Sequence, residues 1–185
     1  MENENPRRME VDSRTIQRAL AGDQSALAYI YDTYAKSIYR YHHSRVGNTP
    51  DAEDLTSQTF MAVIEALPRY QHRNNFTAWI FQIARSKVMD HFRRNHAHEE
   101  IHESVADPAQ GEALETVVRN ESRARLQSLL HLLDEDEREL IRLRYTAELS
   151  FVEIAQLLGR KEDAVRKSIR RILNRLSIQM EAQNA

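Results

Sequence analysis

The sequence has 185 residues, 41% of them hydrophobic, which is enough to bury the core of one or two small domains. It has no cysteine, which excludes disulfides and thiolate metal sites, and no apolar run that could span a membrane. The net charge of -2 hides a pattern, because residues 98–118 carry six Asp or Glu and no Lys or Arg, between two mildly basic halves. With four Gly, four Pro and a polar start unlike a signal peptide, the composition predicts an all-α cytoplasmic protein without membrane insertion.

In the first half of the chain, residues 1–13 are predicted to form a flexible tail. Apolar residues at helical spacing then predict three helices, with a turn at Gly47 to Pro50 and a stop at Pro68. A polar segment, 69–75, precedes the third helix as a loop. The expected helices cover residues 23–46, 50 or 51–67, and 76–95.

Residues 97–118 lack a sustained apolar face, and Asp107-Pro108 and Gly111 interrupt them, so they predict a flexible acidic linker. Helices are expected after it at about 115–133, 135–146, 150–158 and 161–180. The predicted fold is therefore all-α, with two small helical domains joined by the linker and a helix-turn-helix in the second. The expected divisions are a tail at 1–13, a first domain at 14–96, the linker at 97–118 and a second domain at 119–182.

The clearest local signal is a helix-turn-helix that begins at Ser150. Ser150 and Glu153 have the spacing of a capping box, in which each side chain binds the backbone amide of the other residue. Apolar residues at helical spacing follow, and Gly159 stands where the chain can reverse through a left-handed residue. A second helix is then expected from about Lys161.

This second helix separates apolar and cationic residues onto opposite sides. Its expected buried stripe is Val165, Ile169, Ile172 and Leu176. The other side carries five cations and no acid, so we expect these cations to lack ordinary i,i+4 ion pairs and to bind a DNA backbone. The alternatives are a solvated basic face and an amphipathic membrane helix. The five cations are Arg166, Lys167, Arg170, Arg171 and Arg175.

Several segments resemble conserved regions of the sigma-70 family of RNA polymerase sigma factors. Residues 133–145, 149–155, 158–159 and 165–171 resemble the fourth conserved region. The second conserved region is matched by residues 31–34, 38–41, 51–60, 67–70, 76–85 and 90–94. The chain has no room for a third region or an N-terminal inhibitory region, which is the layout of the extracytoplasmic-function (ECF) group.

The resemblance implies an alternative sigma factor that binds core RNA polymerase, through the β′ coiled coil and the β flap, and directs promoter recognition and transcription initiation. An anti-sigma factor is expected as a further partner. The implied contacts to the -35 element are Lys161, Arg166, Lys167, Arg170, Arg171 and Arg175. Those to the -10 element are Arg73, Asn74, Asn75, Arg85, Lys87, His91, Arg93 and Arg94. The implied polymerase contacts are Asp51, Glu53, Asp54, Leu55, Gln58 and Phe60.

Two residues depart from the family pattern, and a third has two possible roles. Lys161 stands where the family commonly has a Ser or Thr cap, and Glu162 and Asp163 are expected to compensate in part through the helix dipole. Gln58 stands where Glu is frequent. Trp79, the only tryptophan, is predicted to lie in the core rather than to stack on bases.

Two other functions fit parts of the sequence. A stand-alone transcriptional regulator would use only the helix-turn-helix. A zinc hydrolase would use His98-Glu99-Glu100-Ile101-His102, which matches H-E-x-x-H, but the motif lies in a charged linker with no evident third ligand. His96, His98 and His102 could also bind a metal incidentally. No phosphate-binding loop or nucleophile elbow is present, so we predict no enzyme activity, cofactor or resident metal.

Overall fold

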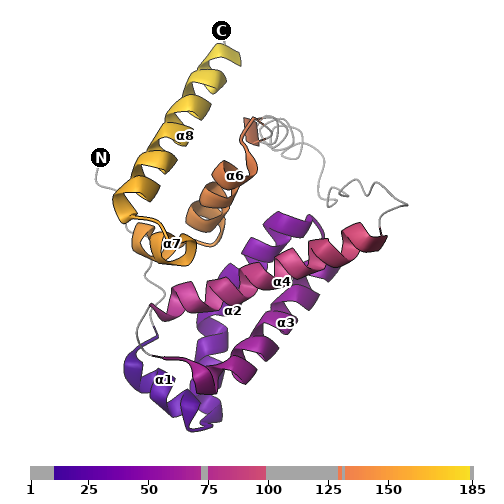
Figure 1. Ribbon diagram of the computed structural model, residues 1–185, viewed down its shortest axis with the longest axis vertical. Coiled ribbons are helices and arrows are strands. Elements are labelled where there is room, and N and C mark those ends of the chain that lie inside the picture. Colours follow the sequence, from indigo (N-terminus) through magenta and orange to yellow (C-terminus); the bar gives the residue numbers. More distant parts are fainter. Residues whose placement is uncertain (1–10, 72–74, 99–128, 131, 184–185) are drawn as a thin grey trace, which may run out of the picture.

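The computed structural model describes residues 11–71, 75–98, 129–130 and 132–183. The described chain is helical, without a strand (Figure 1), and none of its helices is long and apolar enough to cross a membrane. Its elements are α1 (Ser13–Leu20), α2 (Gln24–Val46), α3 (Thr49–Ala66), η1 (Leu67–Arg69), α4 (Phe76–His98), α6 (Glu135–Ile141), η2 (Arg142–Thr146), α7 (Phe151–Leu158) and α8 (Glu162–Gln183).

The three helices expected in the first half are confirmed as α2, α3 and α4. The Asp23 side chain caps α2 by accepting from the amides of Ser25 and Ala26, at 2.9 and 3.3 Å. Gly47 ends α2 in the left-handed conformation, with φ +78°. Asn48 then caps α3, so the turn expected here is made by residues suited to each role.

Helix α1 was not among the expected elements. Asp12 caps it by accepting from the Thr15 amide at 2.7 Å, and Ile16 and Ala19 are buried. Val11, within the predicted tail, is buried as well. A helix of two turns holds too few apolar positions for periodicity to identify it, and its stability comes from packing on α2.

Helices α2, α3 and α4 pack around an aromatic core that includes Tyr34 and Phe81. His42 lies at its centre with no solvent exposure. Its Nδ1 is 3.2 Å from the Thr56 hydroxyl on α3, and its Nε2 donates to the Ala84 carbonyl on α4 at 3.3 Å. One imidazole therefore connects all three helices. Burial lowers the pKa of His42 to about 4, and the bond to Ala84 offsets only part of that effect.

The second half packs α6, η2, α7 and α8 around buried residues that include Leu143, Ile154 and Ile172, and these belong to the same apolar cluster as the core of the first half. Asp134 and Glu137 form a capping box at the start of α6. The single helix expected over 135–146 is α6 followed by one turn of π-helix, η2. Within η2, the buried Arg144 side chain donates to the Leu149 carbonyl at 2.9 Å.

The two halves lie in contact, with α7 beside α4 and η2 against α2, whereas α8 extends away from the N-terminal bundle (Figure 1). The acidic linker expected at 97–118 falls almost wholly outside the described residues. The proposed domain boundaries therefore stay predictions.

We predict that replacing His42 by Gln makes stability less sensitive to acid. Below pH 6.5 the unfolded chain takes up a proton at residue 42, whereas the folded chain does so only near pH 4. The free energy of unfolding should therefore fall as the pH drops through this window, by about 1.4 kcal/mol per pH unit at most. Urea unfolding at several pH values would measure the slope. The half-buried His43→Gln variant is the control, and an equal slope in wild type and His42→Gln would contradict the prediction.

Candidate nucleic-acid interface

The helix-turn-helix is formed as its sequence predicts. The Ser150 side chain accepts from the Glu153 amide at 3.2 Å, and the Glu153 carboxylate accepts from the Ser150 amide at 2.6 Å. Gly159 has φ +63° and ends α7. An L side chain rarely adopts this backbone conformation, so the glycine makes the tight reversal into α8 possible.

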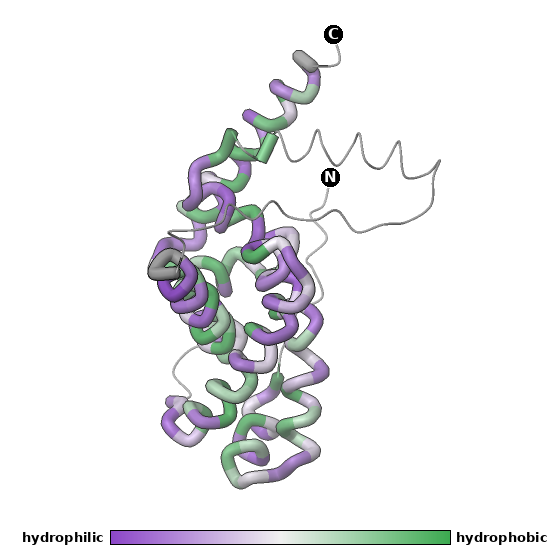
Figure 2. The backbone as a smooth tube through the Cα atoms, turned by 90° about the vertical axis from the view of Figure 1, so that its right-hand side faces the viewer, coloured by the Kyte–Doolittle hydropathy of each residue, from purple (hydrophilic) through white to green (hydrophobic). Residues whose placement is uncertain are grey.

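Helix α8 has the two faces expected of it, and hydrophilic and hydrophobic residues alternate along it toward the C-terminus (Figure 2). The apolar stripe is buried, with 0–8% exposure at Val165, Ile169, Ile172 and Leu176. All five cations of the other face are exposed. The helix thus attaches to its domain by one side and presents positive charge on the other, which suits a groove of duplex DNA.

One expectation about these cations is wrong, because two of them have acidic partners. Arg166 pairs with Glu162 one turn earlier at 2.5 Å, and Arg175 pairs with Glu137 of α6. Glu162 lies in the first turn of α8, and Glu137 is distant in sequence. The pattern of the cationic face alone therefore does not reveal either acid as a partner. In the described residues, Lys167, Arg170 and Arg171 form no ion pair, and they are the cations free to meet phosphate.

An aromatic side chain helps to fix one edge of the cationic face. Two guanidinium groups lie over the Phe151 ring, with Arg144 4.3 Å and Arg166 4.5 Å from its centre. Beside it is a groove of about 390 Å³ that also includes the exposed side chains of Tyr145 and Leu173. Sequence reasoning did not single out Tyr145, because its place beside α8 depends on the turn of π-helix.

At the start of α8, Lys161 stands where a Ser or Thr side chain would cap the helix. The Lys161 carbonyl accepts from the amides of Ala164 and Val165 at 3.0 and 3.1 Å, which places Lys161 at the cap position. No capping bond from the Lys161 side chain is present in the described structure. Glu162 and Asp163 put negative charge in the first turn, where the helix dipole favours it.

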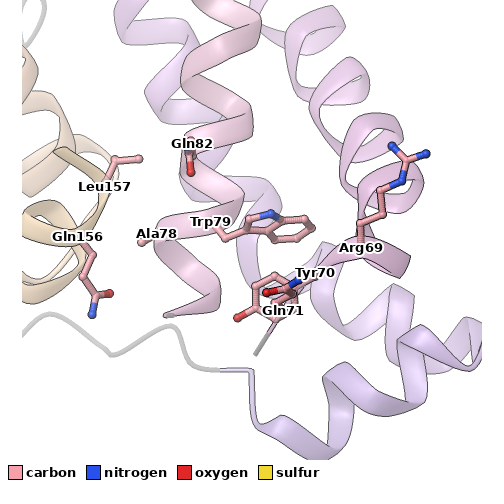
Figure 3. Close-up of a pocket in the computed structure, with 8 residues that line it drawn as sticks. All are labelled: Arg69, Tyr70, Gln71, Ala78, Trp79, Gln82, Gln156 and Leu157. Atoms are coloured by element: carbon pink, nitrogen blue, oxygen red, sulfur yellow. The ribbon is translucent and has the colours of Figure 1, made fainter. Parts of the chain in front are cut away.

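A second candidate surface lies where the chain enters α4. Tyr70, Phe76 and Trp79 form an aromatic cluster, with ring centres 4.8 Å apart for Tyr70 and Trp79 and 5.3 Å apart for Phe76 and Trp79. Trp79 is only partly buried and faces a pocket of about 240 Å³ (Figure 3). Trp79 therefore packs against the core without being fully buried, and it also lines this pocket. Gln156 and Leu157 of α7 form another wall of this pocket.

The other residues expected at the -10 element are distributed along α4. The Asn75 side chain accepts from the Thr77 amide at 2.9 Å and starts the helix. Arg85 reaches Glu139 of the second half at 3.3 Å. His91 lies 3.7 Å from Asp51 of α3. Arg93 and Arg94 bind Asp90, Lys87 is half-buried, and Arg73 and Asn74 lie outside the described residues.

The surface expected to meet polymerase lies on α3. Glu53 and Asp54 are exposed, and Gln58 donates to Asp54 at 2.6 Å. Leu55 and Phe60, however, are only 0% and 7% exposed, so these expected contacts belong to the core.

The apolar residues that α3 does expose are Met61 and Ile64, at 57% and 54%. Asp54, Gln58, Met61 and Glu65 recur at helical spacing on one face, a signal that was available in the sequence.

The H-E-x-x-H motif lies outside the described residues apart from His98, the last residue of α4. Within the described part of the chain, no cluster of three or more His, Asp or Glu could hold a metal ion.

Two family models match the chain in succession. The model described as Sigma-70 region 2 matches residues 30–98, and that described as Sigma-70, region 4 matches residues 123–176. The chain is 32% identical over 155 residues to the ECF RNA polymerase sigma factor BldN of Streptomyces coelicolor, covering 82% of this chain and 59% of BldN. It is also 32% identical over 177 residues to the ECF RNA polymerase sigma factor SigD of Mycobacterium tuberculosis, covering 90% of this chain and 82% of SigD.

Solved structures share the fold. CnrH in complex with the cytosolic domain of CnrY matches with a TM-score of 0.69 and 25% identity, over 94% of this chain and 99% of CnrH. The sigma factor RpoE in complex with the anti-sigma factor NepR, from Bartonella quintana, matches with a TM-score of 0.59 and 23% identity, over 82% of this chain and 94% of RpoE.

We predict that Lys161→Ser stabilises the C-terminal half while weakening its binding to DNA. A serine hydroxyl could cap the free amides at the start of α8, which is worth about 1 kcal/mol. The same change removes an exposed cation from the end of α8 that is expected to meet DNA. Thermal unfolding and duplex binding would be measured together, with Lys161→Gln separating loss of charge from gain of the cap. A serine variant no more stable than the glutamine variant would contradict the capping argument.

Proposed function

This chain belongs to the ECF group of the sigma-70 family, and we propose that it binds core RNA polymerase and directs it to promoters as an alternative sigma factor. The observation that carries the proposal is the succession of region 2 and region 4 along one chain. We place it in the cytoplasm, where bacterial transcription takes place. The polymerase supplies the chemistry of RNA synthesis, so we propose no enzymatic role for this chain.

We propose that α8 reads the -35 element from the major groove. Lys167, Arg170 and Arg171 are exposed and have no acidic partner in the described chain, so they are the main candidates for phosphate and base contacts. On binding DNA, Arg166 and Arg175 would leave their carboxylate partners, Glu162 and Glu137, and pair with phosphates instead. Lys161 sits at the end of the helix that enters the groove first.

We propose that the loop before α4 and the first turns of α4 bind the melted -10 element. An unstacked base gains roughly 1–3 kcal/mol on an aromatic surface, and Tyr70 and Trp79 provide one beside Arg69. Arg85 and Lys87 would accompany the displaced strand. The predicted contacts at Arg73, Asn74, Asn75, His91, Arg93 and Arg94 belong to the same proposal.

We propose that the exposed face of α3 binds the β′ coiled coil of the polymerase. Its acids Glu53 and Asp54 would set the approach to basic side chains, and Met61 and Ile64 would supply the apolar anchors. The C-terminal half would contact the β flap. Since the RpoE structure is a complex with an anti-sigma factor, we also propose a partner of that kind here.

Reconstitution with core polymerase tests the proposal directly. The protein, core enzyme and a library of promoter fragments would be mixed, and specific initiation would be mapped by sequencing the transcripts. Initiation that requires the added chain supports a sigma factor. Tight duplex binding without any association with core enzyme would instead indicate a stand-alone regulator.

We predict that Met61→Asp weakens binding to core polymerase by about tenfold or more, because it places a charge at the centre of the proposed apolar contact. Met61 is 57% exposed, so the fold should tolerate the change. The matched control is Tyr29→Asp, at a residue 54% exposed on α2 and outside the surfaces proposed to bind polymerase. Binding would be measured by fluorescence titration of labelled chain with core enzyme. Equal losses in both variants would remove α3 from the interface.

We predict that Arg170→Ala and Arg171→Ala each reduce the salt dependence of duplex binding by about one unit of slope, as expected for one lost phosphate contact. Anisotropy titrations over a range of salt concentrations would measure it. Arg14→Ala, an exposed cation on α1, is the control and should leave the slope unchanged. Wild-type slopes in both α8 variants would mean that this face does not meet DNA.

A further inference from the structure

Phe151, the first residue of α7, connects the apolar core of the helix-turn-helix with its cationic surface. Its half-buried side chain packs against the core. The Cζ atoms of Arg144 and Arg166 lie 4.3 and 4.5 Å from the centre of its ring. Arg144 belongs to η2 and is 7% exposed, whereas Arg166 is an exposed residue of α8. One ring therefore contacts both a buried cation and a surface cation that is a candidate for DNA binding.

The two guanidinium groups have different roles. Arg144 donates through Nη1 to the Leu149 carbonyl at 2.9 Å, so it holds the segment between η2 and α7 from the inside. Burial lowers the pKa of Arg144, and the neighbouring charge of Arg166 acts in the same direction. Like charges repel each other, so Arg144 does not attract Arg166 to this place. The face of the Phe151 ring, which attracts cations, supplies that attraction.

Arg166 has a second contact, with an acid. Its Nη2 pairs with the carboxylate of Glu162 at 2.5 Å while its Cζ lies over the ring. Both contacts are possible because a guanidinium that meets a ring through its face keeps its N–H groups for other acceptors. A phosphate would compete with Glu162 for those N–H groups, but it would not compete with the ring. Phe151 can thus hold Arg166 both before and after DNA replaces the acid.

We propose that Phe151 is a positioning residue of the DNA interface, which holds the Arg166 guanidinium in place for an anionic oxygen of the duplex backbone. This inference rests on the proposed function, because it gives Phe151 a part in DNA binding by α8. Fixing a long side chain in advance reduces the entropy lost on binding, so the ring raises affinity without touching DNA. Among the cations of α8 that the structure describes, Arg166 alone lies over an aromatic ring.

A double-mutant cycle between Phe151 and Arg166 tests the proposal in the full-length chain. Phe151→Leu removes the ring but keeps an apolar side chain, and Arg166→Ala removes the cation. The probe is a short duplex of random sequence, because phosphate contacts do not depend on sequence, and fluorescence anisotropy measures its affinity. Phe151→Leu should weaken binding by about threefold to tenfold when Arg166 is present, and should have no further effect in Arg166→Ala. Equal losses in both backgrounds would overturn the proposal.

Three controls separate positioning from a general loss of structure. Phe151→Leu combined with Arg171→Ala should be additive, because Arg171 is exposed on α8 without a ring contact in the described chain. Phe151→Tyr keeps the ring and should retain the coupling to Arg166. Tyr145→Leu removes another aromatic ring from the same groove, one with no guanidinium over it in the described structure, and should show no coupling to Arg166. Thermal unfolding would verify that each variant is folded.

The contact between the ring and Arg166 can also be measured without DNA. Protons that lie over an aromatic ring resonate upfield of their usual position, so nuclear magnetic resonance reports the contact directly. In Phe151→Leu, the side-chain protons of Arg166 should move downfield toward the values of an unstructured arginine, whereas in Phe151→Tyr they should stay near those of the wild type. Unchanged Arg166 resonances in Phe151→Leu would overturn the proposal. This failure is distinct from failure of the proposed function, which would appear as no initiation with core polymerase.

Discussion

Burying a carboxylate requires donors that replace its water, and Glu139 finds them in the other half of the chain. Tyr41, Arg45 and Arg85 converge on it from two helices. Removing such an acid from water is costly unless each oxygen is paired, so the position of α6 depends on α2 and α4. This requirement acts together with the Arg40–Glu148 ion pair and the packing of η2 on α2 and of α7 on α4 to place the C-terminal half.

That placement gives the two candidate DNA surfaces different properties. Helix α8 attaches through an apolar stripe and keeps its cations in water, because the stripe faces its own domain. The aromatic pocket at the start of α4 is shared with α7.

Within each half, the residues that hold the helices together differ from the exposed residues that are proposed to meet partners. His42 ties α2, α3 and α4 together at the centre of the first bundle, with no exposure to solvent. On the outside, α3 turns acids and the side chains of Met61 and Ile64 toward solvent. In the second half the capping boxes at Ser150 and Asp134 fix the helix starts by local bonds. Surface residues can therefore vary with the partner while the helices stay in place.

The sequence by itself determined the helix-turn-helix, because its capping box, Gly159 reversal and apolar stripe all depend on residues within a few turns of each other. It also determined α2, α3 and α4, whose periodicity is long, but not α1, which is too short to show one. Only the tertiary structure placed Leu55 in the core and paired Arg175 with Glu137, since helical spacing identifies a face but not what covers it. The same reason applies to Glu139, which reads as an ordinary surface acid until its three donors, distant in sequence, are brought around it by folding.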